Sequence, residues 1–294
     1  MAQIKSWEVS DDFWTKVEPL IPVRQRPTNR KYQRRPGGGR KPMPARRVFA
    51  AIVYVLRTGC QWKALPKELG SASAIHQHFQ QWHRAGFFVA LWRSGLAEYD
   101  EMEGIAWDWQ SVDGAMAKAP LAVECVGANP TDRGKNGRKR SLLVDGRGVP
   151  LSIVASGANV PDVKLLAATL DQVVRARPAP RAKAPQHLCA DAGYKGAPAR
   201  QAVEKRHYRP HIKQRREEAD GKRKRPGYKA RRWVVERTHS WLNRFRKLLV
   251  SFEKTEESYV ALLALAAAMI CWRQTIIIYG YALSRSATER APPA

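Results

Sequence analysis

Apolar residues recur at helical spacing along the first third of the chain. The pattern predicts helices over residues 11–21, 45–58, 71–85 and 87–102. Residues 71–85 turn their apolar side chains inward and present a polar outer face of Gln77, His78, Gln81 and Arg84. Two helices joined by a short connection are typical of a helix-turn-helix-like region whose second helix enters a major groove, although helices packed without DNA give the same pattern.

From about residue 105 the pattern changes to short apolar runs that alternate with helical segments. Strands are expected at 107–112, 142–144, 149–154, 187–190 and 208–212. The second and third of these flank the hairpin turn Asp145-Gly146-Arg147-Gly148. Further helices are expected at 162–174, 197–206 and 231–248. This order predicts a mixed α/β sheet flanked by helices after an all-helical region, with a division into residues 1–104 and 105–294.

The longest apolar run covers residues 259–272 and is closed by Arg273. Its 14 residues are fewer than the roughly 20 that cross a bilayer, so we expect a buried C-terminal helix and no membrane partner. The first residues, MAQIKSWEVSDDF, lack the apolar core of a signal peptide. Four widely separated cysteines show no zinc-site spacing, which favours reduced core residues in a cytoplasmic protein.

Charge makes nucleic acid the leading partner. The chain has 52 Lys and Arg against 26 Asp and Glu, a formal net charge of +26, which exceeds what solubility requires. A membrane-surface protein and a merely solvated basic surface are the alternatives. Residues 24–41 contain a Pro-Gly-Gly-Gly break and no acid, which predicts a basic arm that binds phosphates without reading sequence. We expect such contacts from Arg34, Arg35, Arg40 and Lys41.

Isolated acids in so basic a chain need a chemical reason. Glu236 lies within RRWVVERTHSWLNRFRKL, where a carboxylate would repel phosphate. Asp113 and Asp191 each end a predicted strand beside a glycine, where a metal and a phosphate can approach closely. Three carboxylates can hold two Mg²⁺ or Mn²⁺ ions, which neutralise charge at the attacking and leaving oxygens of a phosphodiester.

Each acid also has a purely structural interpretation. Glu236 could pair with Arg232, four residues earlier on the predicted helix. Helical spacing places Glu236 and His239 on a polar face opposite an apolar stripe. The remaining candidates occupy ordinary positions: a hairpin turn for Asp145, a helix start for Asp162, a solvated loop for Asp132 and the opposite strand face for Asp108.

Three segments resemble the acidic blocks of DDE transposases of the insertion-sequence-five group. They are WQSVDGAMAKAP, LCADAGYKG and RRWVVERTHSWLNRFRKL, and the helical stretch VLRTGCQWKALPKELGSASAIHQHFQQW is similar to the N-terminal region of that group. The resemblance covers about residues 7–272. It implies a ribonuclease-H-like catalytic domain and a metal-binding triad of Asp113, Asp191 and Glu236.

The resemblance also implies a function. Such a transposase binds terminal inverted repeats, frees 3′-hydroxyls at the transposon ends and joins them to target DNA with two Mg²⁺ or Mn²⁺ ions, acting as a homodimer or larger assembly. The pattern around the third acid is partly matched, because Asn243 occupies a lysine position and Tyr228 is shifted by one residue. DNA contacts are expected from Lys195, Arg232, Arg244 and Lys247.

Two other functions fit the same residues. A nuclease of this fold would cut DNA without joining it. A DNA-binding repressor derived from a transposase would bind ends and leave them intact.

Overall fold

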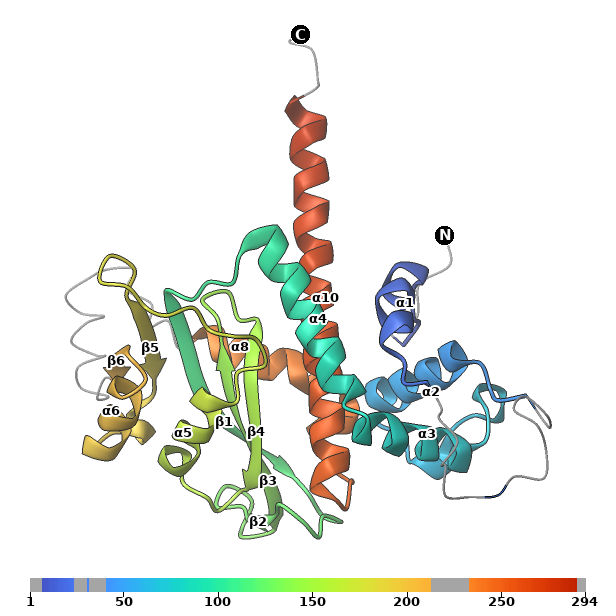
Figure 1. Ribbon diagram of the computed structural model, residues 1–294. Coiled ribbons are helices and arrows are strands. Elements are labelled where there is room, and N and C mark those ends of the chain that lie inside the picture. The colour runs from blue at the N-terminus through green and yellow to red at the C-terminus, as the bar shows by residue number, and fades with distance from the viewer. Residues whose placement is uncertain (1–6, 24–30, 32–40, 213–232, 290–294) are drawn as a thin grey trace.

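The computed structural model describes residues 7–23, 31, 41–212 and 233–289, with side chains up to residue 277. Its N-terminal part is helical, as predicted (Figure 1). The helices are α1 (Asp11–Val17), α2 (Ala45–Thr58), α3 (Ala72–Arg84) and α4 (Phe87–Glu103), with a 3-10 turn at Glu18–Leu20. The Ser10 hydroxyl caps α1 by accepting a hydrogen bond from the Phe13 amide.

The connection between α2 and α3 is longer than a helix-turn-helix turn. Two 3-10 helices, Trp62–Ala64 and Lys67–Leu69, lie within it, whereas the DNA-binding motif joins its helices by about 3–4 residues. Gly59 begins the connection with a positive φ of 73°, the usual end of a helix. Apart from Lys31 and Lys41, the predicted basic arm lies outside the described residues.

The second part of the chain forms one mixed sheet. Its strands are β1 (Trp109–Lys118), β2 (Gly127–Ala128), β3 (Asn136–Val144), β4 (Pro150–Gly157), β5 (Gln186–Ala190) and β6 (Tyr208–Ile212). β3 pairs antiparallel with β1, β2 and β4, and β5 pairs parallel with both β1 and β6. Three antiparallel strands followed by two parallel ones give the ribonuclease-H-like order β4-β3-β1-β5-β6, which confirms the predicted fold class.

Helices cover both faces of this sheet. They are α5 (Asp162–Asp171), α6 (Ala197–Glu204), α8 (Trp233–Asn243), α9 (Arg246–Leu249) and α10 (Glu256–Glu289), with a 3-10 turn at Ala192–Tyr194. Neighbouring residues of β3 identify the two faces. Ser141 accepts a hydrogen bond from Thr169 of α5, whereas Arg140 bonds to Asn243 of α8. Because successive residues of a strand point to opposite faces, α5 and α8 lie on opposite sides of β3.

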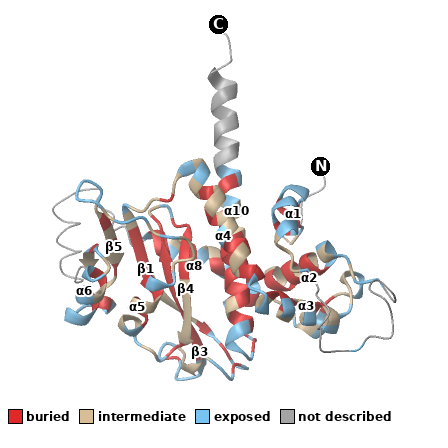
Figure 2. Ribbon diagram, viewed as in Figure 1, coloured by how far each residue is buried: buried red, intermediate tan, exposed pale blue. Residues whose placement is uncertain are grey.

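Two C-terminal helices differ from the prediction. The helix expected over residues 231–248 ends at Asn243, and the separate short helix α9 follows it. Conversely, α10 extends far beyond the predicted apolar run. Residues Glu256–Ile277 are long and apolar enough to cross a membrane, but 67% of the 18-residue apolar window within them is buried inside the protein. There α10 packs against α4 and forms part of the central core (Figures 1 and 2).

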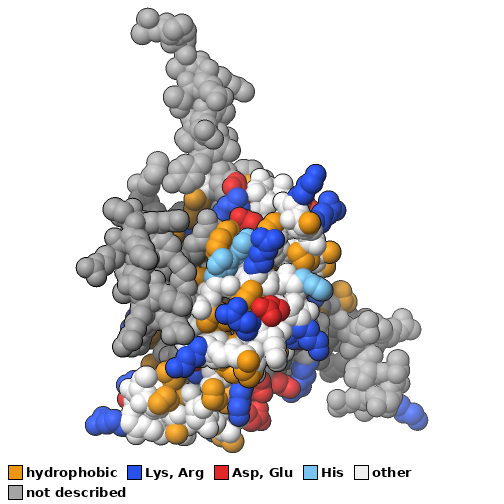
Figure 3. Space-filling model, turned by 90° about the vertical axis from the view of Figure 1, so that its left-hand side faces the viewer, with side chains coloured by type: hydrophobic (Ala, Val, Ile, Leu, Met, Phe, Trp, Pro, Cys, Tyr) orange, Lys and Arg blue, Asp and Glu red, His pale blue; other side chains and the backbone are white. Residues whose placement is uncertain are grey.

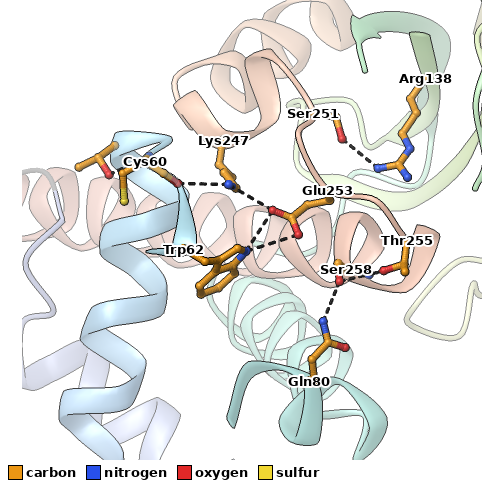
Figure 4. Close-up of polar contacts among 10 residues, drawn as sticks. Cys60, Trp62, Gln80, Arg138, Lys247, Ser251, Glu253, Thr255 and Ser258 are labelled. Carbon is orange, nitrogen blue, oxygen red and sulfur yellow. Dashed lines mark hydrogen bonds and ion pairs between the residues drawn. The ribbon is translucent and has the colours of Figure 1, made fainter. Parts of the chain in front are cut away.

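A buried polar network joins the helical region to the segment after α8. The Lys247 ammonium, 2% exposed, lies 3.1 Å from the Cys60 carbonyl and 3.2 Å from the Glu253 carboxylate. The indole nitrogen of Trp62 donates to the same carboxylate at 3.1 Å (Figure 4). Farther along, Gln80 of α3 donates to the Ser258 hydroxyl of α10 at 2.7 Å. These contacts and the shared core make the two parts of the chain one packed structure.

Candidate active site

Strand register brings Asp113 and Asp191 together. In the parallel pair β1–β5, Trp109 lies opposite His187 and Ser111 opposite Cys189. Continued two residues further along both chains, this register places Asp113 opposite Asp191, just beyond the end of β5. Each carboxylate accepts a hydrogen bond from a nearby glycine amide, at 2.8 Å from Gly114 and 2.7 Å from Gly193.

The prediction that the first strand ends at Asp113 was wrong. β1 continues to Lys118 because residues 111–118 pair with β3. Asp113 is therefore an interior strand residue opposite Leu142 of β3. The shorter strand β5 ends beside it, and this difference in length leaves one side of Asp113 open to Asp191.

α8 carries the third acid, Glu236, in its first turn, where the side chain is exposed. The opposite side of the helix is buried against β1 and β3 through Val234, Val235 and Leu242. The Thr238 hydroxyl also donates to the Gly148 carbonyl at 2.6 Å, in the β3–β4 turn. Gly148 has a φ of +88°, and a Cβ there would lie 3.0 Å from the Thr238 hydroxyl oxygen. The turn therefore fixes the position of α8 on the sheet.

Electrostatics indicate that these acids share one region. Burial and, after it, the charges of Asp191, Asp162 and Glu236 together raise the pKa of Asp113 to about 7, against the opposing effect of the Gly114 hydrogen bond. The carboxylates at the end of β5 and on α8 thus both act on the carboxyl group of β1.

Asp162 is an additional acid that the sequence interpretation treated as an ordinary helix start. It does begin α5, but its carboxylate also lies 3.1 Å from the ammonium of Lys139, a buried residue of β3. It packs directly on the strand residue after Asp113, since a Cβ added to Gly114 would lie 2.0 Å from Asp162 Oδ1. The Asp113-Gly114 dipeptide was the available signal, because a glycine within a strand often marks a close approach.

The donor chemistry fits a hard divalent ion. Carboxylate oxygens are the ligands that Mg²⁺ and Mn²⁺ prefer. A bound cation would counter both the burial and the neighbouring negative charges that raise the pKa of Asp113. Among the described residues, no three His, Cys, Asp or Glu side chains converge closely enough to hold an ion. Metal binding by these acids therefore requires their side chains to move toward a common point.

The spacing of His239 from Glu236 had suggested that both side chains line a polar cleft. In the structure His239 does not line one. It is 7% exposed, and burial together with the neighbouring Arg140 guanidinium lowers its pKa to about 3 while the Asp113 backbone opposes the shift. The imidazole is therefore neutral. Arg140 is itself buried and donates to Asn243 at the end of α8.

Of the other acids, Asp145 keeps its predicted role, whereas Asp108 lies in the turn before β1 and not within the strand. Asp145 is fully buried in the hairpin turn and accepts hydrogen bonds from the Arg147 and Val149 amides. Asp132, expected to be solvated, has a side chain only 19% exposed and lies 3.5 Å from the Lys118 ammonium.

The predicted DNA-contacting residues differ in accessibility. On α3, Gln77, Gln81 and Arg84 are exposed and His78 is half-buried, so the predicted outer face is present. Further exposed members of the predicted set are Lys41, Lys195 and Arg244. Arg34, Arg35, Arg40 and Arg232 lie outside the described residues.

Lys247 does not suit the phosphate contact predicted for it. Its ammonium is enclosed by Glu253 and the Cys60 carbonyl, because the helix breaks after Asn243 and turns this residue toward α2 (Figure 4). On the side of the molecule formed by α6 and β6, Lys and Arg side chains are interspersed with acids and histidines rather than gathered in one patch (Figure 3).

Comparison with known proteins identifies the family. Residues 9–92 match the family described as putative transposase of IS4/5 family, and residues 100–271 match the transposase DDE domain. Over 152 residues the chain is 38% identical to a putative transposase for insertion sequence element IS402 from Burkholderia cepacia, covering 50% of this chain and 68% of that protein. An uncharacterized 16.2 kDa protein of the same element is 30% identical over 124 residues, covering 42% and 80%.

Solved structures offer only distant likenesses. A pre-cleavage Mos1 transpososome is 11% identical with a TM-score of 0.27, covering 80% of this chain and 81% of that one. The Mos1 mariner paired end complex with Mn is 12% identical with the same TM-score, covering 82% of each chain. The match of residues 100–271 is by contrast extensive and falls on the sheet and helices that carry Asp113, Asp191 and Glu236. The chain belongs to the DDE transposases of the IS4/5 family.

Proposed function

We propose that this transposase binds the terminal inverted repeats of its element, cuts them to free 3′-hydroxyls and joins those hydroxyls to target DNA. The observation that carries the proposal is the register that places Asp113 opposite Asp191, with Glu236 close enough to affect the same carboxyl group. In this proposal residues 1–104 bind the DNA ends and residues 105–294 carry out the chemistry. Two ends must be processed together, so the active form is at least a dimer.

Asp113, Asp191 and Glu236 are the proposed ligands of two Mg²⁺ or Mn²⁺ ions. Bound ions would neutralise the charge that develops on the attacking and leaving oxygens. The chain's own contribution is to hold the carboxylates. The Gly114 and Gly193 amides orient Asp113 and Asp191, and Thr238 fixes the helix that carries Glu236.

Both proposed steps are in-line displacements at phosphorus. A water molecule first attacks the scissile phosphodiester and releases the 3′-hydroxyl of the element. That hydroxyl then attacks a phosphodiester of target DNA, forms a new P–O bond and releases a target 3′-hydroxyl. Neither step requires a covalent bond to the protein, so no nucleophilic side chain is needed beside the carboxylates.

The proposed DNA path uses the exposed basic and amide side chains. The outer face of α3, including Gln77, Gln81 and Arg84, would face a groove of the inverted repeat. Lys195 and Arg244 are exposed and follow Asp191 and α8 respectively, so they would contact backbone phosphates near the cut. Arg34, Arg35, Arg40, Lys41 and Arg232 are proposed as further phosphate contacts.

The test is strand cleavage and joining on labelled duplexes that carry the element's own ends, with Mg²⁺ or Mn²⁺. The proposal expects both nicked and joined products from the wild type. It expects neither from Glu236→Gln, which should still bind the ends. Glu257→Gln, which removes an exposed acid at the start of α10, is the matched control and should cut like the wild type.

The same assay separates the alternatives. Nicks without joined products in any condition would indicate a nuclease. Tight binding that metal does not affect, with no cleavage by the wild type, would indicate a repressor and overturn the proposal.

A further inference from the structure

Strand β3 carries two arginines that are buried without an acidic partner. Arg138 is 0% exposed and Arg140 is 2% exposed, and no carboxylate of the described residues lies within ion-pair distance of either guanidinium. By contrast, the buried ammonium groups of Lys139 and Lys247 each lie within 3.2 Å of a carboxylate. Buried charges in proteins are normally paired. The two arginines therefore leave positive charge in the core that no adjacent acid of the described chain neutralises.

The two guanidiniums differ in their hydrogen bonds. Arg138 donates from all of its side-chain nitrogens, to the Ser251 hydroxyl and to two backbone carbonyls (Figure 4). Arg140 donates from Nη2 to Asn243 of α8, but its buried Nε and Nη1 have no partner in the described chain. A buried polar group left in this way indicates an ordered water or an ion at the site.

Two more side chains with unpaired polar atoms lie around Arg140. His239 precedes Asn243 by four residues and so shares its face of α8, and neither of its ring nitrogens has a partner among the described residues. The buried Tyr259 hydroxyl of α10 also has none, and the Tyr259 ring lies 4.9 Å from the guanidinium carbon of Arg138, on the same face of β3 as Arg140. Burial lowers the pKa of His239 and raises that of Tyr259, and the nearby charge of Arg140 lowers both. Three elements thus bring these side chains into one buried cluster.

The unpaired atoms of this cluster are mainly hydrogen-bond donors. Arg140 offers two donor nitrogens, and the imidazole and the phenol hydroxyl each offer at least one donor. A ligand that only accepts hydrogen bonds and carries negative charge satisfies these donors and neutralises the guanidinium. A water molecule brings two donors of its own and leaves the charge in place.

We propose that Arg140, His239 and Tyr259 enclose a buried site for a monatomic anion of the chloride class. The site lies where β3, α8 and α10 meet, so the anion holds the helix that carries Glu236 against the sheet. Anion binding here is independent of the proposed function, because neither DNA nor a metal ion is needed to fill the site.

Crystals of the full chain, grown without chloride and soaked in sodium bromide, provide the first test. We expect an anomalous bromide peak within hydrogen-bonding reach of the Arg140 guanidinium, and no such peak in Arg140→Met. Water alone at this position would overturn the site. A peak that appears only at the bromide concentration of the soak, with no effect of chloride in solution, would be an adventitious ion and would also overturn it.

Urea denaturation in chloride and in gluconate at equal ionic strength provides the second test. Above the dissociation constant of the anion, each tenfold rise in chloride should raise the folding equilibrium constant of the wild type about tenfold. Tyr259→Phe keeps the ring and removes one donor, so it should bind chloride about 2-fold to 13-fold more weakly. This milder variant decides the question if Arg140→Met does not fold.

Tyr208→Phe is the matched control. It removes another buried phenol hydroxyl, which donates to Gln110 instead of facing the cluster, and it should keep the wild-type dependence on chloride. Equal stability of the wild type in the two salts would overturn the site. A chloride dependence that neither Arg140→Met nor Tyr259→Phe changes would place the anion elsewhere and would overturn it too.

Discussion

A buried histidine gives the clearest prediction at the scale of single residues. The pKa of His239 is about 3 in the folded protein and ordinary, near 6.5, in the unfolded chain. Between these values the unfolded chain binds the extra proton, so this residue's contribution to stability is complete above pH 6.5 and is lost as pH falls. We expect urea denaturation to show a loss on the order of 1.4 kcal/mol per pH unit at most.

The variant His239→Gln removes this dependence. Its free energy of unfolding should fall less steeply than that of the wild type between pH 6.5 and 4.5. His83→Gln, at a half-buried histidine of α3, should keep the wild-type slope. Equal slopes for all three proteins would show that His239 can be protonated in the folded state.

At the scale of elements, the position of α8 on the sheet is critical for the site, because this helix carries Glu236. Thr238→Val keeps the shape of the side chain but removes its hydrogen bond to Gly148. We expect a loss of about 1–3 kcal/mol in the free energy of unfolding, because a buried carbonyl is left without its donor. We also expect slower end cleavage, because Glu236 shares this helix.

Thr275→Val is the matched control for Thr238→Val. It removes a buried hydroxyl that bonds to the Trp272 carbonyl on α10. It should not slow cleavage at temperatures where the protein is folded. Normal cleavage by Thr238→Val, measured under the same conditions, would show that the turn does not position Glu236.

Comparison of the predicted and observed elements shows which features of the fold could be inferred from the sequence. The alternation of apolar runs was sufficient to predict the mixed sheet and to place Asp113 and Asp191 on its first and fourth predicted strands, but the pairing of those two strands came only from the structure. The break after Asn243 was missed because Asn243-Arg244-Phe245 contains neither glycine nor proline. Because that break was missed, Lys247 was predicted to lie on the polar face of one long helix. In the structure its ammonium contacts the Cys60 carbonyl and the Glu253 carboxylate. Asp162 was missed because the glycine it packs on is distant in sequence.

At the scale of the whole molecule, the Lys247–Glu253 pair helps to join the helical region to the sheet, because it contacts Cys60 and Trp62. Both side chains are almost fully buried. Lys247→Met leaves the Glu253 carboxylate without its cation, and we expect it to cost about 3–5 kcal/mol of unfolding free energy. The double variant Lys247→Met with Glu253→Leu should cost less than the single one, because neither charge then remains buried alone.

A solvent-exposed pair provides the comparison. The ion pair of Arg46 with Asp11 has side chains 45% and 86% exposed, and Asp11→Asn should cost less than about 1 kcal/mol. A Lys247→Met protein as stable as the wild type in urea denaturation would show that this ion pair does not help to hold the two parts together.

Metal-specificity exchange at Asp191 tests the proposed metal site most directly. In Asp191→Cys a thiolate replaces a carboxylate oxygen, and sulfur binds Mn²⁺ better than Mg²⁺. We expect this variant to bind the ends, to be inactive in cleavage with Mg²⁺ and to recover part of the wild-type rate with Mn²⁺, while Asp132→Cys cuts normally with either ion. Wild-type cleavage by Asp191→Cys with Mg²⁺ would rule out the proposed metal site, because the carboxylate opposite Asp113 would then have no role in holding the metal.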